Sequence, residues 1–301
     1  AFSSFLWGWP LLIMLLGTHL YLTAILRFPQ RYLLKALKLY FVKDHTDKGD
    51  ISPFSSLMVA LAANIGAGNI IGVGVAIAAG GPGAVFWCWL TGVLGMATRY
   101  SEGLLAIKYR VENKDGNMSG GPMFVLERGL NSKWLGTAFA VFTAIAAFGI
   151  GNLTQGNAAA EQLHHAFSIP SWGTAAVLTA LTALVMLGGI QGIARVCAFF
   201  VPFMAVIYIM GCLYILTIQA EYIFPAIRYI LDCAFTGEAA AGGAAGAAVM
   251  AAMRTGVARG LFSNEAGLGS AAIASAAAQN RNPVRQALIS SSGPFWDTVI
   301  I

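Results

Sequence analysis

Long apolar runs alternate with short polar segments along the 301 residues of the chain. A run of about 20 mainly apolar residues is long enough to cross a bilayer as a helix. We therefore predict an all-α polytopic membrane protein. Its expected spans cover residues 5–26, 52–79, 84–107, 134–167, 173–190, 196–218 and 239–257, and another begins near residue 286.

The second of these spans does not read as a plain membrane anchor. Between residues 60 and 76 it holds four glycines and two asparagines. Glycine weakens a helix by about 1 kcal/mol, and a polar amide in hydrocarbon is costly without a partner. Irregular backbone at membrane depth is tolerated only where it is buried in protein or lines a cavity. We predict an interrupted helix in which Asn64 and Asn69 face a small polar ligand or a cation; close helix packing through small residues is the alternative.

A second polar cluster lies at membrane depth in the span 134–167. Asn152 and Gln155 are three residues apart and share one helix face. They are candidates for contacts with the polar groups of a ligand, and an interhelical hydrogen bond is the alternative. Arg99 and Glu102 share a face in the same way, and we predict a structural ion pair. Asp297 is expected to be buried in the last span.

Composition and charge agree with a membrane protein. The chain is 57% hydrophobic and 10% charged, with a mean hydropathy of +0.71, whereas soluble domains carry about 25% charged residues. Of the 18 Lys and Arg residues, 16 fall in the segments that follow the first, third, fifth and seventh spans. The positive-inside rule places these segments in the cytoplasm and the N-terminus outside the cell membrane. This distribution explains the net charge of +5 without nucleic acid as a partner.

Enzymatic and metal chemistry find no support in the sequence. The four cysteines show no metal-ligand spacing. No Ser-His pair, carboxylate pair or metal-ligand set lies at matching depth. We expect neither an enzyme nor a cofactor, and no obligate protein partner is evident beyond the lipid bilayer.

The last apolar helix before residue 257 is also rich in glycine, at positions 242, 243 and 246. It lies five spans after the interrupted helix, so the two run in opposite directions. Interrupted helices at matching positions of two inverted halves are typical of the substrate site of a secondary transporter. On this interpretation the substrate site holds Asn64, Gly66, Ala67, Gly68, Asn69, Asn152, Gln155 and Gly246, with the 66–68 amides at the substrate carboxylate. The backbone carbonyls of Ala62 and Ile65 would bind Na⁺, a hard cation that prefers oxygen ligands.

Several stretches carry a resemblance to a known family. They are 49–54 (Gly-Asp-Ile-Ser-Pro-Phe), 66–70 (Gly-Ala-Gly-Asn-Ile), 80–87 (Gly-Gly-Pro-Gly-Ala-Val-Phe-Trp), 116–123 (Gly-Asn-Met-Ser-Gly-Gly-Pro-Met) and, longest, 256–270 (Gly-Val-Ala-Arg-Gly-Leu-Phe-Ser-Asn-Glu-Ala-Gly-Leu-Gly-Ser). The chain resembles the alanine or glycine:cation symporter family. Where this chain has Asn64 and Ala67, that family usually has threonine.

The resemblance implies a five-plus-five inverted-repeat transporter fold with one extra N-terminal helix, and a chain that is incomplete at its C-terminus. Residues 1–51 would form the extra span and a basic amphipathic segment. Residues 52–220 would form the first repeat, and residues 221–301 an outer segment and the start of the second. The implied function is symport of alanine or glycine with Na⁺, or with H⁺. An uncoupled amino-acid facilitator or channel is the alternative.

Overall fold

The computed structural model describes residues 8–42, 49–149, 152–236 and 245–301, without the side chains of residues 67 and 245–248. Within these ranges the chain is almost entirely helical. The helices are α2 (Trp9–Ile25), η1 (Pro29–Tyr32), α3 (Leu33–Leu39), α4 (Pro53–Asn64), α5 (Ala67–Gly80), α6 (Gly83–Tyr109), α7 (Pro122–Arg128), α8 (Lys133–Ala147), α9 (Asn152–Phe167), α10 (Ser171–Leu187), α11 (Gly189–Ile218), α12 (Ala220–Phe235), α13 (Ala245–Asn264), α14 (Ser270–Ala276), α15 (Pro283–Ser291) and η2 (Phe295–Ile300).

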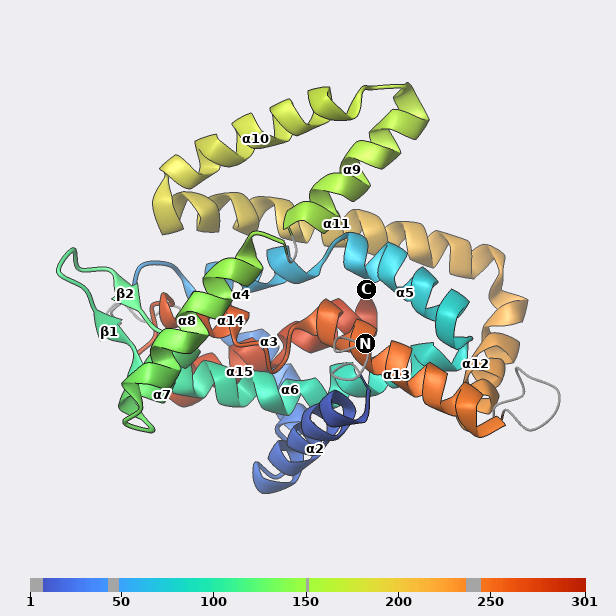
Figure 1. Cartoon of the computed structure of the whole chain (residues 1–301), viewed down its shortest axis with the longest axis horizontal. Helices are drawn as coiled ribbons and strands as arrows, with labels where there is room; N and C mark the ends of the chain where they lie inside the picture. Colours follow the sequence, from blue (N-terminus) through green and yellow to red (C-terminus); the bar gives the residue numbers. More distant parts are fainter. Residues whose placement is uncertain (1–7, 43–48, 150–151, 237–244) are drawn as a thin grey trace.

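Helix α6 lies at the centre of the body, where α2, α12, α13, α14, α15 and η2 pack against it (Figure 1). Small residues allow these close approaches. A Cβ atom on Gly256 of α13 would lie 2.2 Å from the carbonyl oxygen of Ala84 on α6. One turn further along α13, a Cβ on Gly260 would lie 1.7 Å from Thr91 Oγ1. Only glycine fits these two positions, so the α6–α13 contact is encoded in the sequence.

The interrupted helix that the sequence predicts is confirmed. Helix α4 starts at Pro53, and Ser52 caps its N-terminus. The Oγ of Ser52 accepts a hydrogen bond from the Ser55 amide at 3.0 Å. It ends at Asn64 because Ile65 and Gly66 are extended, and α5 then resumes. The two halves are bent by 40° at this break. Asn64 and Ile65 are buried at this point, so the break is held by its neighbours.

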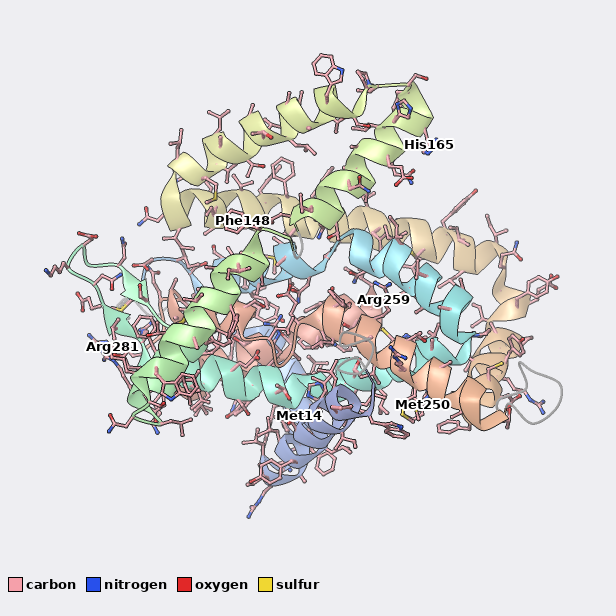
Figure 2. All side chains as sticks on the ribbon, viewed as in Figure 1. Met14, Phe148, His165, Met250, Arg259 and Arg281 are labelled. Carbon is pink, nitrogen blue, oxygen red and sulfur yellow. The ribbon has the colours of Figure 1, made fainter. Side chains whose placement is uncertain are left out.

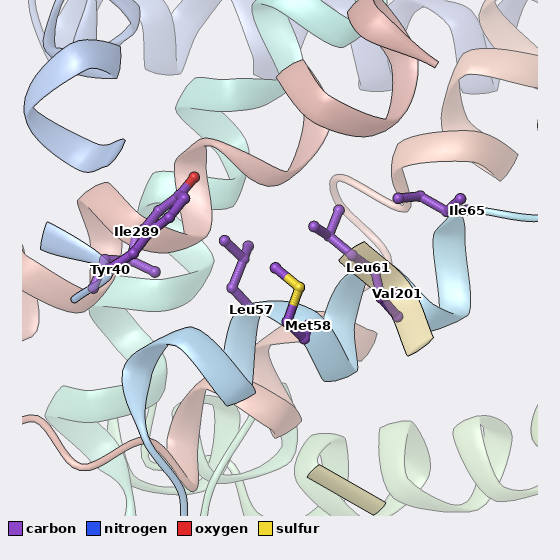
Figure 3. Packing of buried hydrophobic residues seen from close by; sticks show 7 residues of the cluster. All are labelled: Tyr40, Leu57, Met58, Leu61, Ile65, Val201 and Ile289. Atoms are coloured by element: carbon purple, nitrogen blue, oxygen red, sulfur yellow. The ribbon is translucent and has the colours of Figure 1, made fainter. Parts of the chain in front are cut away.

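A buried apolar cluster fixes the first half of this broken helix (Figure 3). Leu57, Met58 and Leu61 of α4 pack with Ile65, with Tyr40 at the end of α3, with Val201 of α11 and with Ile289 of α15. Residues from four separate parts of the chain thus meet on one face of α4. This packing holds the break at a defined place between α11 and α15.

Helices α8 to α11 form the outer part of the structure, and α9 and α10 extend away from the body (Figure 1). Their apolar side chains are largely exposed, for example Leu187 of α10 at 85%, and so is Phe148 just after α8, at 82% (Figure 2). In the described part of the chain, two segments are long and apolar enough to cross a membrane, 133–167 and 189–218. The number rises to four if the bent pairs α2 with η1–α3 and α4 with α5 each count as one span.

The structure adds detail at two of the expected boundaries and corrects a third. The predicted span 134–167 agrees with the apolar segment 133–167, in which Phe148 and Gly149 form a turn after α8. The polar segment after α6 contains a small antiparallel sheet, β1 (Val111–Glu112) with β2 (Met118–Ser119). Helix α13 does not end near residue 257 but continues to Asn264. Arg254 and Arg259, two of the 16 basic residues predicted to be cytoplasmic, therefore lie on a helix beside α5.

Candidate polar centre between the broken helices

A buried carboxylate joins three segments of the chain next to the break. Asp297, in η2, is fully buried. Its Oδ1 accepts a hydrogen bond from Asn69 Nδ2 on α5 at 2.9 Å. Its Oδ2 accepts from Ser263 Oγ on α13 at 2.6 Å and from Thr298 Oγ1 at 2.9 Å. We call Asn69, Ser263, Asp297 and Thr298 the polar centre.

The chemistry of the polar centre suits a small hard cation. None of the ion pairs within the described part of the chain includes Asp297. A buried carboxylate is costly unless a positive charge or hydrogen bonds compensate it. The Oδ1 atom of Asn69 is also buried without a hydrogen-bond partner. Two carboxylate oxygens, two hydroxyls and one amide oxygen thus lie close together, and these are the ligand types that hard cations take.

Asn64, the last residue of α4, connects the end of α4 to the end of α13. Its Nδ2 donates to the backbone oxygen of Asn264, the last residue of α13, at 3.3 Å. Arg99 Nε on α6 donates to the same oxygen at 3.1 Å. The hydrogen bond to the end of α13 therefore positions the Asn64 side chain. Its Oδ1 is buried and makes no hydrogen bond.

An interruption that the sequence did not predict lies after α13, whereas the predicted one, at Gly242, Gly243 and Gly246, falls mainly outside the described residues, with Gly246 in the first turn of α13. Residues 265–269 separate α13 from α14, and Glu265, Gly267 and Gly269 have left-handed backbone conformations. Glu102 Oε1 on α6 accepts hydrogen bonds from the Gly267 and Gly269 amides, at 2.9 Å and 3.1 Å. The predicted pair of Arg99 with Glu102 is confirmed, at 3.8 Å. We call residues 265–269 the α13–α14 break; Asn264 and Glu265, which flank its start, carry a structural role here.

The other predicted site residues are placed in different ways. The Gln155 side chain lies against Gly66, because a Cβ atom there would be 2.2 Å from Gln155 Oε1. Asn152 is exposed and donates to the Ala147 carbonyl at 2.7 Å, which caps α8. Gly246 is 17 residues from Ser263, about 25 Å along a helix, so it does not join the polar centre. Gly242 and Gly243 lie outside the described residues.

Few backbone hydrogen bonds are formed at the first break. Among the described residues, the Ile65 amide donates to Leu61 O and the Asn69 amide donates to Gly66 O. Beside them, no backbone hydrogen bond outside the regular helices is accepted by the Ala62 or Ile65 carbonyl. Gly68 has open space around it. Ala67 begins α5, and its side chain lies outside the described part.

A small internal cavity of about 10 Å³ lies beside Asn64. Asn64 Oδ1 and Arg99 Nη1, which belong to lining residues, are buried and make no hydrogen bond. The volume suits one water molecule and is far too small for an amino acid. Ser56, Ser275 and Ser290 also line it.

Ser263 and Thr298 are functional candidates that sequence reasoning missed. Both are short hydroxyl residues in segments that read as glycine-rich or apolar, so neither stands out by type. The available signal was Asp297, because an acid inside a span needs donors from neighbouring helices. Ser263 follows Phe262 within the distinctive stretch 256–270.

The interrupted helix, the buried acid and the apolar helices around them define a polytopic helical membrane protein with a polar centre at its helix breaks. The profile of the sodium:alanine symporter family matches residues 1–301, and the chain belongs to this family. It is 54% identical to an "Uncharacterized transporter" of Haemophilus influenzae, over 100% of this chain and 66% of that protein. It is 51% identical to the "Sodium/alanine symporter AgcS" of Methanococcus maripaludis, over 99% of this chain and 67% of that protein.

A third relative differs in the substrate that its name gives. The "Probable sodium/glutamine symporter GlnT" of Bacillus subtilis is 36% identical, over 99% of this chain and 62% of that protein. The chain thus spans about two-thirds of the length of the curated relatives that it matches. The resemblance to a symporter family is confirmed at the level of the family.

Proposed function

We propose that this protein is a secondary symporter that couples the inward flow of Na⁺ to uptake of a small neutral amino acid, alanine or glycine, by alternating access. The observation that carries the proposal is the Asp297 carboxylate, which joins the first turn of α5 to the end of α13. Family membership and the name of the sodium/alanine symporter from Methanococcus maripaludis support the ion and the substrate class.

Na⁺ would bind at the polar centre. Asp297 supplies the negative charge, and Asn69 Oδ1 together with the Ser263 and Thr298 hydroxyl oxygens complete an oxygen-rich site. Binding of Na⁺ would remove the cost of a buried carboxylate without an ion pair. The free carbonyls of Ala62 and Ile65 are further candidate ligands for a cation on the α4 side of the break.

The substrate would bind across the break of the first helix. Its carboxylate would meet the Gly66, Ala67 and Gly68 amides, because the N-terminus of a helix of this length is a favourable place for an anion. Gln155 lies against Gly66, and Asn64 lies two residues before it; both would contact the remaining polar groups. Because the cavity beside Asn64 holds only one water, substrate access requires the helices around the break to move apart.

The distribution of basic residues supports a location and an orientation in the membrane. We infer a cell-membrane location with the N-terminus outside. After the correction of α13, 14 of the 18 basic residues remain in segments assigned to the cytoplasm, which supports this orientation. An inverted-repeat organisation would relate α4–α5 to α13–α14, since both pairs are interrupted and the two interruptions meet at Asn64 and Asn264.

Uptake of radiolabelled alanine and glycine by the full-length protein in proteoliposomes tests the proposal. We expect accumulation only under an inward Na⁺ gradient. Flux that continues at the same rate without a cation gradient would instead identify an uncoupled facilitator or channel. Accumulation driven by a proton gradient alone would replace Na⁺ by H⁺ as the coupling ion.

A further inference from the structure

A groove of about 370 Å³ lies between α5 and α13, outside the polar centre. Its volume falls within the range of small-molecule sites. Two arginines and one hydroxyl line it, and no acidic residue among the described ones does so. The lining residues are Val75, Ala76, Ala79, Arg254, Thr255, Ala258, Arg259 and Phe262.

The groove leads towards the polar centre because α5 and α13 pack in opposite directions. A Cβ atom on Gly80, at the end of α5, would lie 1.9 Å from Thr255 Oγ1. Nearer to the break, a Cβ on Gly72 would lie 3.6 Å from Arg259 Cδ. Beyond this level, Asn69 and Ser263 both bind Asp297. The same two helices therefore form the groove and supply ligands of the polar centre.

Arg259 is the arginine of this groove that lies nearer to the polar centre. It lies on the side of α13 that faces α5 (Figure 2) and is half-buried, with its stem against the glycine surface of α5. Within the described part of the chain, it takes part in no ion pair and no hydrogen bond between side chains. A charged residue within a membrane protein normally has a partner, and an arginine in such a position marks a binding path.

We propose that the groove between α5 and α13 binds a small monovalent anion through Arg259, with Arg254 at the outer edge. The planar guanidinium matches a carboxylate or a similar anion. The anion is either the carboxylate of an approaching amino acid, which rests on the proposed function, or a free inorganic anion such as chloride. In both cases the groove concentrates negative charge at the approach to the polar centre.

Cysteine labelling tests the charge of the groove without any need for transport. Ala79 is exposed and lines the groove, so Ala79→Cys places a thiol inside it. The full-length protein in proteoliposomes is treated with an anionic and a cationic methanethiosulfonate reagent of similar size. The reference position is Ser171→Cys, which is exposed at the start of α10, away from the groove. The wild-type chain gives the background of its own four cysteines.

We expect the anionic reagent to react faster at Ala79→Cys, relative to the cationic one, by about tenfold over the ratio at Ser171→Cys. Arg259→Gln should remove most of this preference, and Arg259→Lys should keep it. Arg128→Gln removes an arginine on the exposed face of α7 and should change nothing. Equal ratios at the two cysteines, or a preference that survives Arg259→Gln, would overturn the proposal.

Protection experiments then identify the source of the anion. Chloride, acetate and L-alanine are added at constant ionic strength to the Ala79→Cys protein. Slower labelling with acetate and L-alanine supports a carboxylate, and slower labelling with chloride alone supports an inorganic anion. If none of the three slows labelling, the groove attracts anions without binding them and the proposed site is wrong. A protein that shows the labelling preference but no Na⁺-driven uptake would contradict the proposed function alone.

Discussion

The side-chain amide of Asn69 lies 2.9 Å from Oδ1 of Asp297 and 2.9 Å from its backbone oxygen. These residues are 228 positions apart in the sequence. The double contact ties the first turn of α5 to η2, while Ser263 holds the other carboxylate oxygen from α13. The affinity of this carboxylate for an ion would therefore depend on the positions of α5, α13 and η2. Such a dependence is required if ion binding is to be coupled to the movement of a helix.

Asn69→Ala should weaken Na⁺ and substrate binding together. It removes the donor to Asp297 Oδ1 and a candidate oxygen ligand, and leaves a buried charged acceptor short of one hydrogen bond. Loss of such a bond costs about 1–3 kcal/mol, so we expect the Na⁺ concentration that gives half-maximal uptake to rise by about 5-fold to 150-fold. The measurement is the Na⁺ dependence of alanine uptake by the full-length protein.

Asn152→Ala is the matched control for this change, because Asn152 is an exposed asparagine whose amide only caps α8. Its uptake should stay close to that of the wild type. If Asn69→Ala kept wild-type affinity for both Na⁺ and alanine, Asn69 would have no part in the site. A loss of alanine affinity without any change in Na⁺ affinity would separate the substrate site from the polar centre.

Gly66→Ala should disturb the break through Gln155. The new methyl carbon would lie 2.2 Å from Gln155 Oε1 and 2.6 Å from Nε2, so the amide must swing away. We expect uptake to fall about tenfold or more, with KM raised, since a small misplacement at a site is costly. The clash should also lower the stability of the protein. The double variant Gly66→Ala with Gln155→Ala should recover part of this stability but not the affinity for alanine.

Gly74→Ala is the control for Gly66→Ala, because it lies on α5 with open space around the new methyl group. It should leave KM unchanged and slightly favour the helix. If the KM of Gly66→Ala equals that of the wild type, substrate binding does not depend on the position of Gln155 against Gly66.

The sequence predicts the broken first helix well because its signal is local. Glycines and asparagines inside an apolar run conflict with a regular span, and the break falls at Ile65 and Gly66, within the predicted stretch. The buried state of Asp297 and the pairing of Arg99 with Glu102 follow from the same reasoning about polar groups in hydrocarbon. These inferences need only spacing and burial.

The second break could not be placed in this way because its signals compete. The glycines at 242, 243 and 246 predict an interruption that falls mainly outside the described residues, whereas the described helix α13 uses Gly256 and Gly260 to pack against α6. The actual break at 265–269 is stabilised by Glu102, which is more than 160 residues away. A contact of this range is invisible to periodicity, and so is the partnership of Ser263 with Asp297.

Glu102→Ala should destabilise the protein through the α13–α14 break. The carboxylate accepts hydrogen bonds from the Gly267 and Gly269 amides and lies beside Arg99, which is buried. Its removal leaves Arg99 with its hydrogen bond to the Asn264 carbonyl but without its ion-pair partner, and breaking a buried ion pair in this way costs about 3–5 kcal/mol. The midpoint of unfolding of the purified protein in detergent measures the loss. Glu161→Ala, on the exposed part of α9, should change stability by less than about 0.5 kcal/mol.

Glu102→Gln separates the charge from the hydrogen bonds. The amide oxygen of glutamine can still accept from the two glycine amides, so we expect stability between that of Glu102→Ala and the wild type. If both variants unfold like the wild type, the α13–α14 break is held by its own turns and Glu102 has no positioning role.

Gly256→Ala tests the contact on which the position of α13 depends. The added Cβ atom would lie 2.2 Å from the Ala84 carbonyl oxygen and 2.7 Å from Trp87 Cβ. Since the first of these is backbone, it cannot rotate away, and α13 must shift from α6. Overpacking of this kind costs about 1–3 kcal/mol, and the shift would also move Ser263, two turns further along, from Asp297. We expect both lower thermal stability and weaker Na⁺ dependence of uptake in Gly256→Ala. Gly17→Ala, with open space around it, should affect neither. Normal Na⁺ dependence in a destabilised Gly256→Ala protein would show that α13 reaches the polar centre independently of its packing on α6.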